Sequence, residues 1–329
     1  MSTYKNEDIL SIEYTRDVFK IKWRLTGWCN YHCPYCINGT NKEPNDSWNT
    51  NETLINRAIK LNEMLKKNNI KKPIHLSLLG GEVIFLDIKN IISKIDNISN
   101  LNITTNFSKP IDYFEDLFIW CRNNDIKLFL HCSYHPEAID FKEKLLKLTY
   151  WCQSHNFSTP RGSVVIKPED DAEKILKEYY DFGLTKMVAQ RMKLISDDSL
   201  ADLTDDNQFA IDKFNINYEK IKTNIKKDYK VTFKDGSIAE FKTMSNFLSK
   251  LDHNGFVPNG YLCYSGINCI VINWDGQIYR SNCYELNWKQ SLGNIDYDDI
   301  VLPSNPYVCN NTEIRCCLKN GVSVYKIKE

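Results

Sequence analysis

Three cysteines lie close together near the start of the chain, in the stretch WCNYHCPYC. Cys29, Cys33 and Cys36 have the spacing C-x3-C-x2-C, and thiolates this close on one loop can reach three corners of a single metal centre. A tetrahedral zinc site would need a fourth ligand, for which His32 is the nearest candidate. An iron–sulfur cluster can instead use three cysteines and keep one iron open to a substrate or cofactor.

A second group of cysteines occupies the last quarter of the chain, which has 12 cysteines in 329 residues. Its members are Cys263, Cys269, Cys283, Cys309, Cys316 and Cys317. The N-terminus lacks the charged-then-apolar pattern of a signal peptide, so we expect a cytoplasmic protein in which metal binding or catalysis is favoured over disulfides. Cys121 and Cys152 lie beside apolar residues at helical spacing and are expected in a core, whereas Cys132 has no assigned role.

The charge balance excludes two classes of partner. The chain has 42 basic and 42 acidic residues, which gives a formal net charge of zero. A nucleic-acid binder would be expected to carry a basic surplus, so we expect no nucleic acid partner. The sequence also has no run of about 18 apolar residues, so we expect no membrane span.

Strand-like and helix-like segments alternate between residues 18 and 194, which is the pattern of a parallel α/β unit. The expected strands are residues 18–26, 73–81, 101–107, 127–135, 162–169 and 186–194. The expected helices are residues 52–68, 86–95, 111–124, 139–155 and 171–183. Six strands can form an open sheet or a partly closed barrel, and in both cases ligands bind at the carboxyl ends of the strands. The first cysteine motif directly follows the first strand.

A second motif, Gly80-Gly81-Glu82, ends the second expected strand. Two glycines allow the backbone to approach a ligand closely, because neither residue has a Cβ atom. A carboxylate beside them suits a ligand with an ammonium group. We therefore expect the two motifs to face one site at the same end of the sheet.

Together and in this order, the two motifs resemble those of the radical S-adenosylmethionine (radical SAM) enzymes, with Tyr35 as the aromatic residue before the last cysteine. The resemblance covers about residues 18–195 and implies an α/β fold with a partial (β/α)6 TIM-like barrel. It implies a 4Fe–4S cluster on Cys29, Cys33 and Cys36, and S-adenosylmethionine bound to the fourth iron with its amino group on Gly80-Gly81-Glu82. A flavodoxin- or ferredoxin-type donor would supply one electron, and the resulting 5′-deoxyadenosyl radical would abstract hydrogen from the substrate.

Several other residues are candidate cofactor contacts because they lie at the carboxyl ends of strands. By position, Tyr35 could pack on the adenine or pack within its own loop, Ser133 could bind the ribose or carboxylate, and Arg191 could pair with the methionine carboxylate. The full set is Tyr35, Thr105, Asn106, Ser133, Lys167, Glu169, Gln190 and Arg191. Each polar residue of this set could instead form hydrogen bonds with the backbone groups of its own loop. Of the two histidines that flank Ser133, His135 is a better functional candidate than His131.

The C-terminal segment resembles the auxiliary-cluster extension of radical SAM enzymes in its short, one-cluster form, the twitch domain, rather than the longer SPASM form. The resemblance implies a small cysteine-rich β-hairpin/helix extension that holds one iron–sulfur cluster, expected to be 4Fe–4S. Its implied ligands are Cys263, Cys283, Cys309 and one of the pair Cys316 and Cys317, with Cys316 preferred. Cys269 is expected to be a spare cysteine, and Cys269 and Cys317 are candidate hydrogen-atom donors. A structural zinc ribbon is the alternative.

Three domains are expected: a radical SAM partial barrel at residues 1–195, a linker and substrate-wall segment at 196–255, and the auxiliary-cluster domain at 256–329. Within them, Asp235-Gly236 and Asp275-Gly276 each predict a hairpin turn. Helices are expected around residues 209–227 and 243–252. Only about 17 residues precede the first expected strand, so we expect no N-terminal precursor-binding domain.

The expected function is radical oxidation, epimerisation or crosslinking of a small molecule or a peptide. A dehydrogenation would pass the substrate's second electron to the auxiliary cluster, whereas an epimerisation would return a hydrogen atom from a thiol. The alternative is a non-enzymatic zinc protein with a structural or binding role. That alternative predicts a colourless protein that retains zinc.

Overall fold

The structure is a computed structural model that describes residues 4–31, 33, 36, 49–135, 138, 140–166, 170–182, 187–191, 227–241, 247, 251, 256–280, 291–309 and 322–327. The chain divides into two compact units. The first unit is residues 1–22, 59–75 and 224–329, and the second unit is residues 23–58 and 76–223. The expected boundaries at residues 195 and 255 stay a prediction, since residues 192–226 and 252–255 lie outside the described residues.

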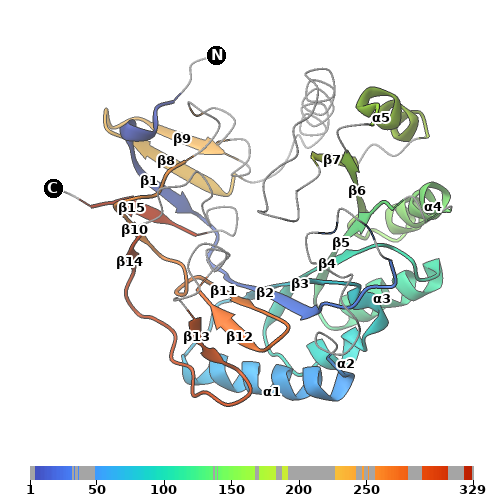
Figure 1. Ribbon diagram of the computed structural model, residues 1–329, viewed down its shortest axis with the longest axis horizontal. Helices are drawn as coiled ribbons and strands as arrows, with labels where there is room; N and C mark the ends of the chain where they lie inside the picture. The colour runs from blue at the N-terminus through green and yellow to red at the C-terminus, as the bar shows by residue number, and fades with distance from the viewer. Residues whose placement is uncertain are drawn as a thin grey trace. The chain divides into compact units, whose positions relative to one another are not determined.

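All eleven strands and helices expected between residues 18 and 194 are present (Figure 1). The strands are β2 (Phe19–Thr26), β3 (Ile74–Gly80), β4 (Ile98–Thr105), β5 (Lys127–Ser133), β6 (Arg161–Ile166) and β7 (Met187–Arg191). The helices are α1 (Asn51–Lys67), α2 (Ile88–Ile92), α3 (Ile111–Asn123), α4 (Phe141–Ser154) and α5 (Ala172–Asp181). The largest difference is α2, which is half as long as expected. It begins after the cap residue Asp87, which follows a 3-10 turn at Val83–Phe85 (η2), and it ends before the C-cap residue Ser93.

The six strands are neighbours in the order β2-β3-β4-β5-β6-β7 within a larger, nine-stranded sheet. The pairs β4–β5, β5–β6 and β6–β7 are parallel. The Phe19 N–H donates to the Pro73 carbonyl at one end of β2 and β3, and the Gly81 N–H donates to the Thr26 carbonyl at the other, so this pair is parallel too. The fold is mixed α/β, and in the described part of the chain the sheet stays open without closing into a barrel.

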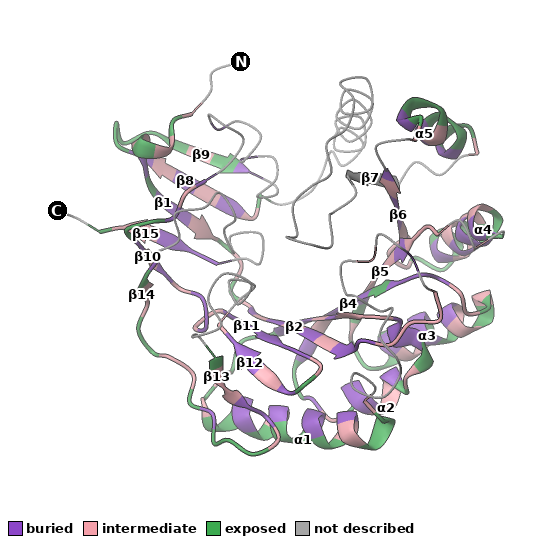
Figure 2. Cartoon of the chain, viewed as in Figure 1, coloured by how far each residue is buried: buried purple, intermediate pink, exposed green. Residues whose placement is uncertain are grey.

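The core of the second unit lies between this sheet and the helices that follow its strands. Figure 1 shows α2, α3, α4 and α5 along one side of the sheet, and Figure 2 shows a buried stripe on the helices. On α3 the buried residues recur at helical spacing: Phe114, Leu117, Phe118 and Cys121. Cys121, Cys132 and Cys152 are all 0% exposed, which confirms that Cys121 and Cys152 are core residues and adds Cys132 to them.

The first unit contains a six-stranded sheet in the order β14-β10-β15-β1-β8-β9. Its strands are β1 (Ile9–Tyr14), β8 (Tyr229–Phe233), β9 (Ile238–Phe241), β10 (Tyr261–Cys263), β14 (Tyr307–Val308) and β15 (Val324–Lys326). The sequence analysis missed β1, which precedes the strand expected at residues 18–26, so that strand is the second in the chain and not the first. Two strands, β8 and β15, flank β1 as antiparallel partners, and both come from residues more than 200 positions later.

Both expected hairpins are confirmed. Strands β8 and β9 turn at Asp235-Gly236, and β11 (Cys269–Ile272) and β12 (Gln277–Tyr279) turn at Asp275-Gly276. Gly236 and Gly276 have φ values of +81° and +83°, in the left-handed region that a side chain disfavours. Strand β13 (Ser291–Asn294) pairs with β12. The helices expected at residues 209–227 and 243–252 fall almost entirely outside the described residues.

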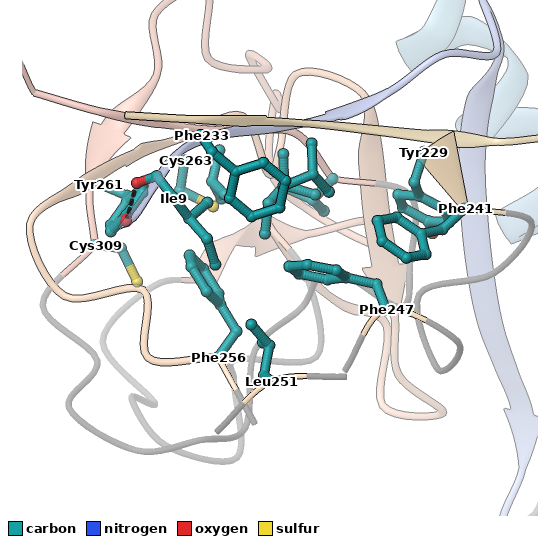
Figure 3. Packing of buried hydrophobic residues seen from close by; sticks show 14 of the residues in the cluster. Ile9, Tyr229, Phe233, Phe241, Phe247, Leu251, Phe256, Tyr261, Cys263 and Cys309 are labelled. Carbon is teal, nitrogen blue, oxygen red and sulfur yellow. Dashed lines mark hydrogen bonds between the residues drawn. The ribbon is translucent and has the colours of Figure 1, made fainter. Parts of the chain in front are cut away.

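A hydrophobic core packs under the six-stranded sheet (Figure 3). It includes Ile9 from β1, Phe233 from β8 and the fully buried rings of Phe247 and Phe256. The Tyr261 hydroxyl group donates to the Ile9 carbonyl at 2.7 Å, which ties β10 to β1 inside this core. No helix within the described residues is both long enough and apolar enough to cross a membrane.

Candidate metal and cofactor site

The first cysteine motif lies on the loop that leaves the carboxyl end of β2. The Trp28 N–H donates to the Thr26 hydroxyl oxygen at 3.0 Å and turns the chain out of the strand. Cys29 and Cys36 are half-buried and Cys33 is 4% exposed. The Cys36 N–H donates to the Cys33 carbonyl at 3.0 Å, which forms a tight turn between these two cysteines.

The Gly-Gly-Glu motif packs directly against the start of this loop. The Gly81 N–H donates to the Thr26 carbonyl and the Glu82 N–H to the Trp28 carbonyl, both at 2.7 Å. A Cβ atom at Gly80 would lie 2.2 Å from the Thr26 oxygen, and one at Gly81 would lie 1.8 Å from the Trp28 oxygen. The two glycines are therefore required by the contact between β3 and the cysteine loop, in addition to any contact with a ligand.

The Glu82 side chain is a buried link between strand ends. It is 1% exposed, and its carboxylate accepts the Asn106 N–H and, at 3.3 Å, the Ile84 N–H. Burial raises the pKa of Glu82 to about 7, although these N–H groups favour the charged form. The carboxylate is enclosed within the protein, while the backbone of Gly80 and Gly81 is half-exposed.

Asn106 connects the end of β4 to the first cysteine. Its side-chain amide donates to the side-chain oxygen Oδ1 of Asn30 at 2.7 Å and approaches the Cys29 sulfur at 3.6 Å. The side-chain oxygen Oδ1 of Asn106 accepts the Ser108 N–H at 3.1 Å, which fixes the orientation of the amide. Thr105 and Asn106 are both buried, and the Thr105 hydroxyl oxygen accepts the Phe107 N–H at 2.9 Å. In this structure Thr105 therefore shapes the loop, and Asn106 contacts the cysteine motif.

The Cys29 sulfur has an environment that suits a bound thiolate. The Tyr31 N–H points to it at 3.4 Å, in addition to the Asn106 amide. Burial raises the pKa of the Cys29 thiol to about 11, so the thiol stays protonated until a metal displaces the proton. Donors directed at sulfur stabilise the negative charge that remains after binding.

The described residues do not form a site for a single metal ion. No three His, Cys, Asp or Glu side chains in this part of the chain lie close enough together to bind one ion. A zinc site brings its thiolates around one atom at about 2.3 Å, whereas an iron–sulfur cluster has several metal atoms and accepts cysteines that are further apart. The donor set of Cys29, Cys33 and Cys36, three thiols on one loop with the Asn106 amide and the Tyr31 N–H directed at Cys29, fits an iron–sulfur cluster.

The other candidate cofactor contacts are only partly described. Ser133 ends β5 and is half-buried, and its hydroxyl oxygen lies 3.4 Å from the Ser163 hydroxyl group on β6. Gln190 and Arg191 are the last residues of β7, at the carboxyl edge where they are expected, and only their backbone is described. Tyr35, Lys167, Glu169 and His32 lie outside the described residues.

In the C-terminal segment the structure describes three of the six cysteines. Cys263 ends β10, Cys269 begins β11 and Cys309 follows β14, and all three are buried in the core of the first unit. Figure 3 shows Cys263 and Cys309 beside Tyr261, whose carbonyl accepts the Cys309 N–H at 2.8 Å. Cys283, Cys316 and Cys317 lie outside the described residues, so the implied ligand set stays a prediction.

Cys269 shares this core with two of the implied ligands. It is 2% exposed, and burial raises the pKa of its thiol to about 12, although the positive charges of Lys20 and Lys22 oppose the rise. Cys263 is close enough to act on the same thiol electrostatically.

The comparisons with known proteins agree with these observations. Residues 22–109, which hold both motifs, match the family described as a 4Fe-4S single cluster domain. The match confirms that a 4Fe–4S cluster belongs to this part of the chain. None of the curated protein sequences matches the chain.

Similar solved structures include two of SuiB from Streptococcus suis. SuiB bound to S-adenosylmethionine has a TM-score of 0.52 and 14% identity over 85% of this chain and 64% of the SuiB chain. SuiB bound to its precursor peptide SuiA has a TM-score of 0.53 and 13% identity over 86% of this chain and 63% of that one. The chain has the radical SAM fold. It spans less than two thirds of the length of the SuiB chains that it matches.

A further structure, anSMEcpe with bound AdoMet, matches with a TM-score of 0.48 and 14% identity over 84% of this chain and 75% of that one. The radical SAM fold confirms the resemblance drawn from the two motifs, and with it the mixed α/β class. A non-enzymatic zinc protein is not favoured by these findings.

Proposed function

We propose that the chain is a radical SAM enzyme that binds a 4Fe–4S cluster through Cys29, Cys33 and Cys36. The observation that carries the proposal is the pair of backbone hydrogen bonds from Gly81 and Glu82 to Thr26 and Trp28. They hold the Gly-Gly-Glu motif against the cysteine loop, so one ligand can contact both. S-adenosylmethionine, when bound, would supply reductive cleavage of its sulfonium group.

The chain's own residues would shape and orient this site. The half-exposed backbone at Gly80 and Gly81 would accept the ammonium group, while the buried Glu82 would hold that backbone in place. Asn106 would orient Cys29, and Ser133 would offer a hydroxyl group at the next strand end. In this proposal the open sheet is the partial (β/α)6 barrel of the family, with Gln190 and Arg191 at its last strand.

A second metal site is proposed in the first unit. Its donors would come from Cys263, Cys283, Cys309 and Cys316 or Cys317, with Cys269 as a further candidate. The burial of the three described cysteines in one core supports this set, because a cluster there would be shielded from water. An auxiliary cluster would accept the second electron in an oxidation of the substrate.

We propose a peptide as the substrate. The support is the likeness to SuiB, which binds the precursor peptide SuiA. Oxidation, epimerisation and crosslinking are all compatible with an auxiliary cluster. Epimerisation would require a thiol that returns a hydrogen atom to the substrate radical. Cys269 and Cys317 are the candidates for this thiol.

The first experiment tests the reactive cluster. The protein, purified and reconstituted without oxygen, should be brown and should convert S-adenosylmethionine to 5′-deoxyadenosine after reduction. Replacement of Cys29, Cys33 and Cys36 with Ala should abolish this conversion. The matched control replaces the buried core cysteines Cys121 and Cys152 with Ala and should keep it. An iron-loaded wild-type protein that leaves S-adenosylmethionine intact would contradict the proposal.

The same triple variant tests the auxiliary site. It should retain about four irons per chain if the first unit holds its own 4Fe–4S cluster. A further Cys263→Ala change should then remove this iron. A triple variant without iron, or with zinc in place of iron, would contradict the auxiliary cluster.

A further inference from the structure

His135 lies in contact with the second cysteine of the motif. Its Nδ1 atom is 2.9 Å from the Cys33 sulfur, across 102 residues of sequence. Cys33 is 4% exposed, so this contact is largely shielded from water. Hydrogen bonds that involve sulfur are usually longer than those to oxygen, and this separation therefore indicates a close contact.

Two neighbouring elements position the histidine. His135 follows β5, where the Tyr134 N–H donates to the Ser163 carbonyl at 2.7 Å and fixes the chain against β6. The ring of Tyr31, from the cysteine loop itself, meets the imidazole edge to face with centroids 5.3 Å apart. The Tyr31 N–H also points to the Cys29 sulfur, so the same residue supports both cysteine contacts.

The chemistry of the pair decides which atom donates. A cysteine that binds iron has lost its proton, so its sulfur can only accept a hydrogen bond. The neutral imidazole can carry its hydrogen on Nδ1, and this tautomer makes the contact favourable without any change of charge. The other tautomer would bring two lone pairs together.

We propose that the Nδ1–H of His135 donates a hydrogen bond to the cluster-bound sulfur of Cys33 and thereby raises the reduction potential of the cluster. A hydrogen bond to a ligand sulfur stabilises the more electron-rich, reduced cluster more than the oxidised one. His135 is thus a positioning residue that acts through Cys33. This inference rests on the proposed cluster at Cys29, Cys33 and Cys36.

Two replacements separate the hydrogen bond from the bulk of the ring. His135→Phe keeps a ring without a donor, and His135→Asn places an amide N–H near the position of Nδ1. His155→Phe is the matched control, because His155 is exposed at the end of α4 and its Nδ1 contacts Trp151 and Ser154. All three are made in the full-length, reconstituted protein.

The readout is the reduced fraction of the cluster at fixed applied potentials. This fraction is measured from the electron paramagnetic resonance signal that changes when S-adenosylmethionine is added. In His135→Phe the ratio of reduced to oxidised cluster should fall about fivefold, as expected from the loss of one hydrogen bond. His135→Asn and His155→Phe should stay close to wild type. Equal ratios in wild type and His135→Phe would overturn the proposal and leave the proposed function intact.

A second measurement uses only the wild-type protein, so its result does not depend on whether a variant binds its cluster. Wild-type protein with 15N-labelled histidine, reduced in the absence of S-adenosylmethionine, should show a weak nitrogen hyperfine coupling to the cluster. The absence of this coupling would overturn the proposal, and so would a strong coupling typical of nitrogen bound directly to iron. A wild-type protein without any cluster would instead overturn the proposed function on which the inference depends.

Discussion

At the scale of single residues, the site depends on side chains that support others. Glu82 is enclosed and joins the ends of β3 and β4 through the Asn106 N–H. Asn106 then extends its amide to Cys29, so a chain of contacts runs from the Gly-Gly-Glu motif to a cluster ligand. The sequence analysis treated Glu82 and Asn106 as separate candidate contacts of the cofactor, whereas the structure joins them.

The raised pKa of Glu82 predicts how stability depends on pH. The pKa of about 7 lies above the ordinary value of 4.5, because burial disfavours the carboxylate. The contribution of protonated Glu82 to the free energy of unfolding is therefore fully present below pH 4.5 and is lost as the pH rises through 7. Between pH 5 and pH 8, metal-free, reduced protein should lose about 1–3 kcal/mol of unfolding free energy through this residue.

Urea unfolding of Glu82→Gln measures this contribution. The variant should lack that part of the decline with pH, because its amide does not titrate. It should also be less stable at low pH, since the NH2 group of the new amide would face a backbone N–H, which is also a donor. Glu63→Gln, on the exposed face of α1, is the control and should follow wild type. Parallel pH profiles for wild type and Glu82→Gln would contradict the prediction.

At the scale of elements, local patterns placed the strands and helices, and contacts between strand ends built the site. The six strands and five helices from β2 to β7 were predictable because their apolar residues either repeat at a fixed interval or crowd into short runs bounded by turn residues. The contact between β3 and the cysteine loop was not, since it depends on the packing of two backbones. At this contact the two glycines allow the backbone of β3 to approach the cysteine loop closely, a role that the motif alone does not reveal.

Gly81→Ala tests that contact. The new Cβ atom would lie 1.8 Å from the Trp28 carbonyl oxygen, and neither backbone can yield without separating β3 from the loop. We expect a loss of about 2 kcal/mol or more in unfolding free energy and a marked loss of iron after reconstitution.

Gly236→Ala is the matched control for this change. Its Cβ atom would meet no atom within 4 Å, so only the strain of a positive φ remains, which costs about 1 kcal/mol. It should bind iron as wild type does. Full iron binding by Gly81→Ala would show that the close approach is not needed for the cluster.

At the scale of the whole molecule, the chain forms two compact units, and the first is built from both ends of the sequence. Strand β15 lies between β10 and β1, with Val324 opposite Cys263 on one side and Ile12 on the other. The core that holds Cys263, Cys269 and Cys309 therefore depends on residues near the N-terminus.

Val324→Asp should disrupt the proposed auxiliary site selectively. Val324 is 0% exposed, and a carboxylate there would be buried without a charged partner, which costs several kcal/mol. In the Cys29, Cys33 and Cys36 triple Ala background, we expect the remaining iron to be lost. Ile327→Asp makes the same kind of change on a side chain that is 41% exposed and should retain the iron. Equal iron contents in the two variants would contradict the link between β15 and the auxiliary site.

The sequence by itself determined the two motifs, the order of strands and helices around them, and both Asp-Gly hairpins. These features are local, because each depends on residue types a few positions apart. Only the tertiary structure decided that Asn106 reaches Cys29 across 77 residues, that His135 reaches Cys33 across 102, and that β1 pairs with strands near the C-terminus. Such contacts follow from how the whole chain packs its apolar faces, and that packing leaves no periodic signal in a single stretch of sequence.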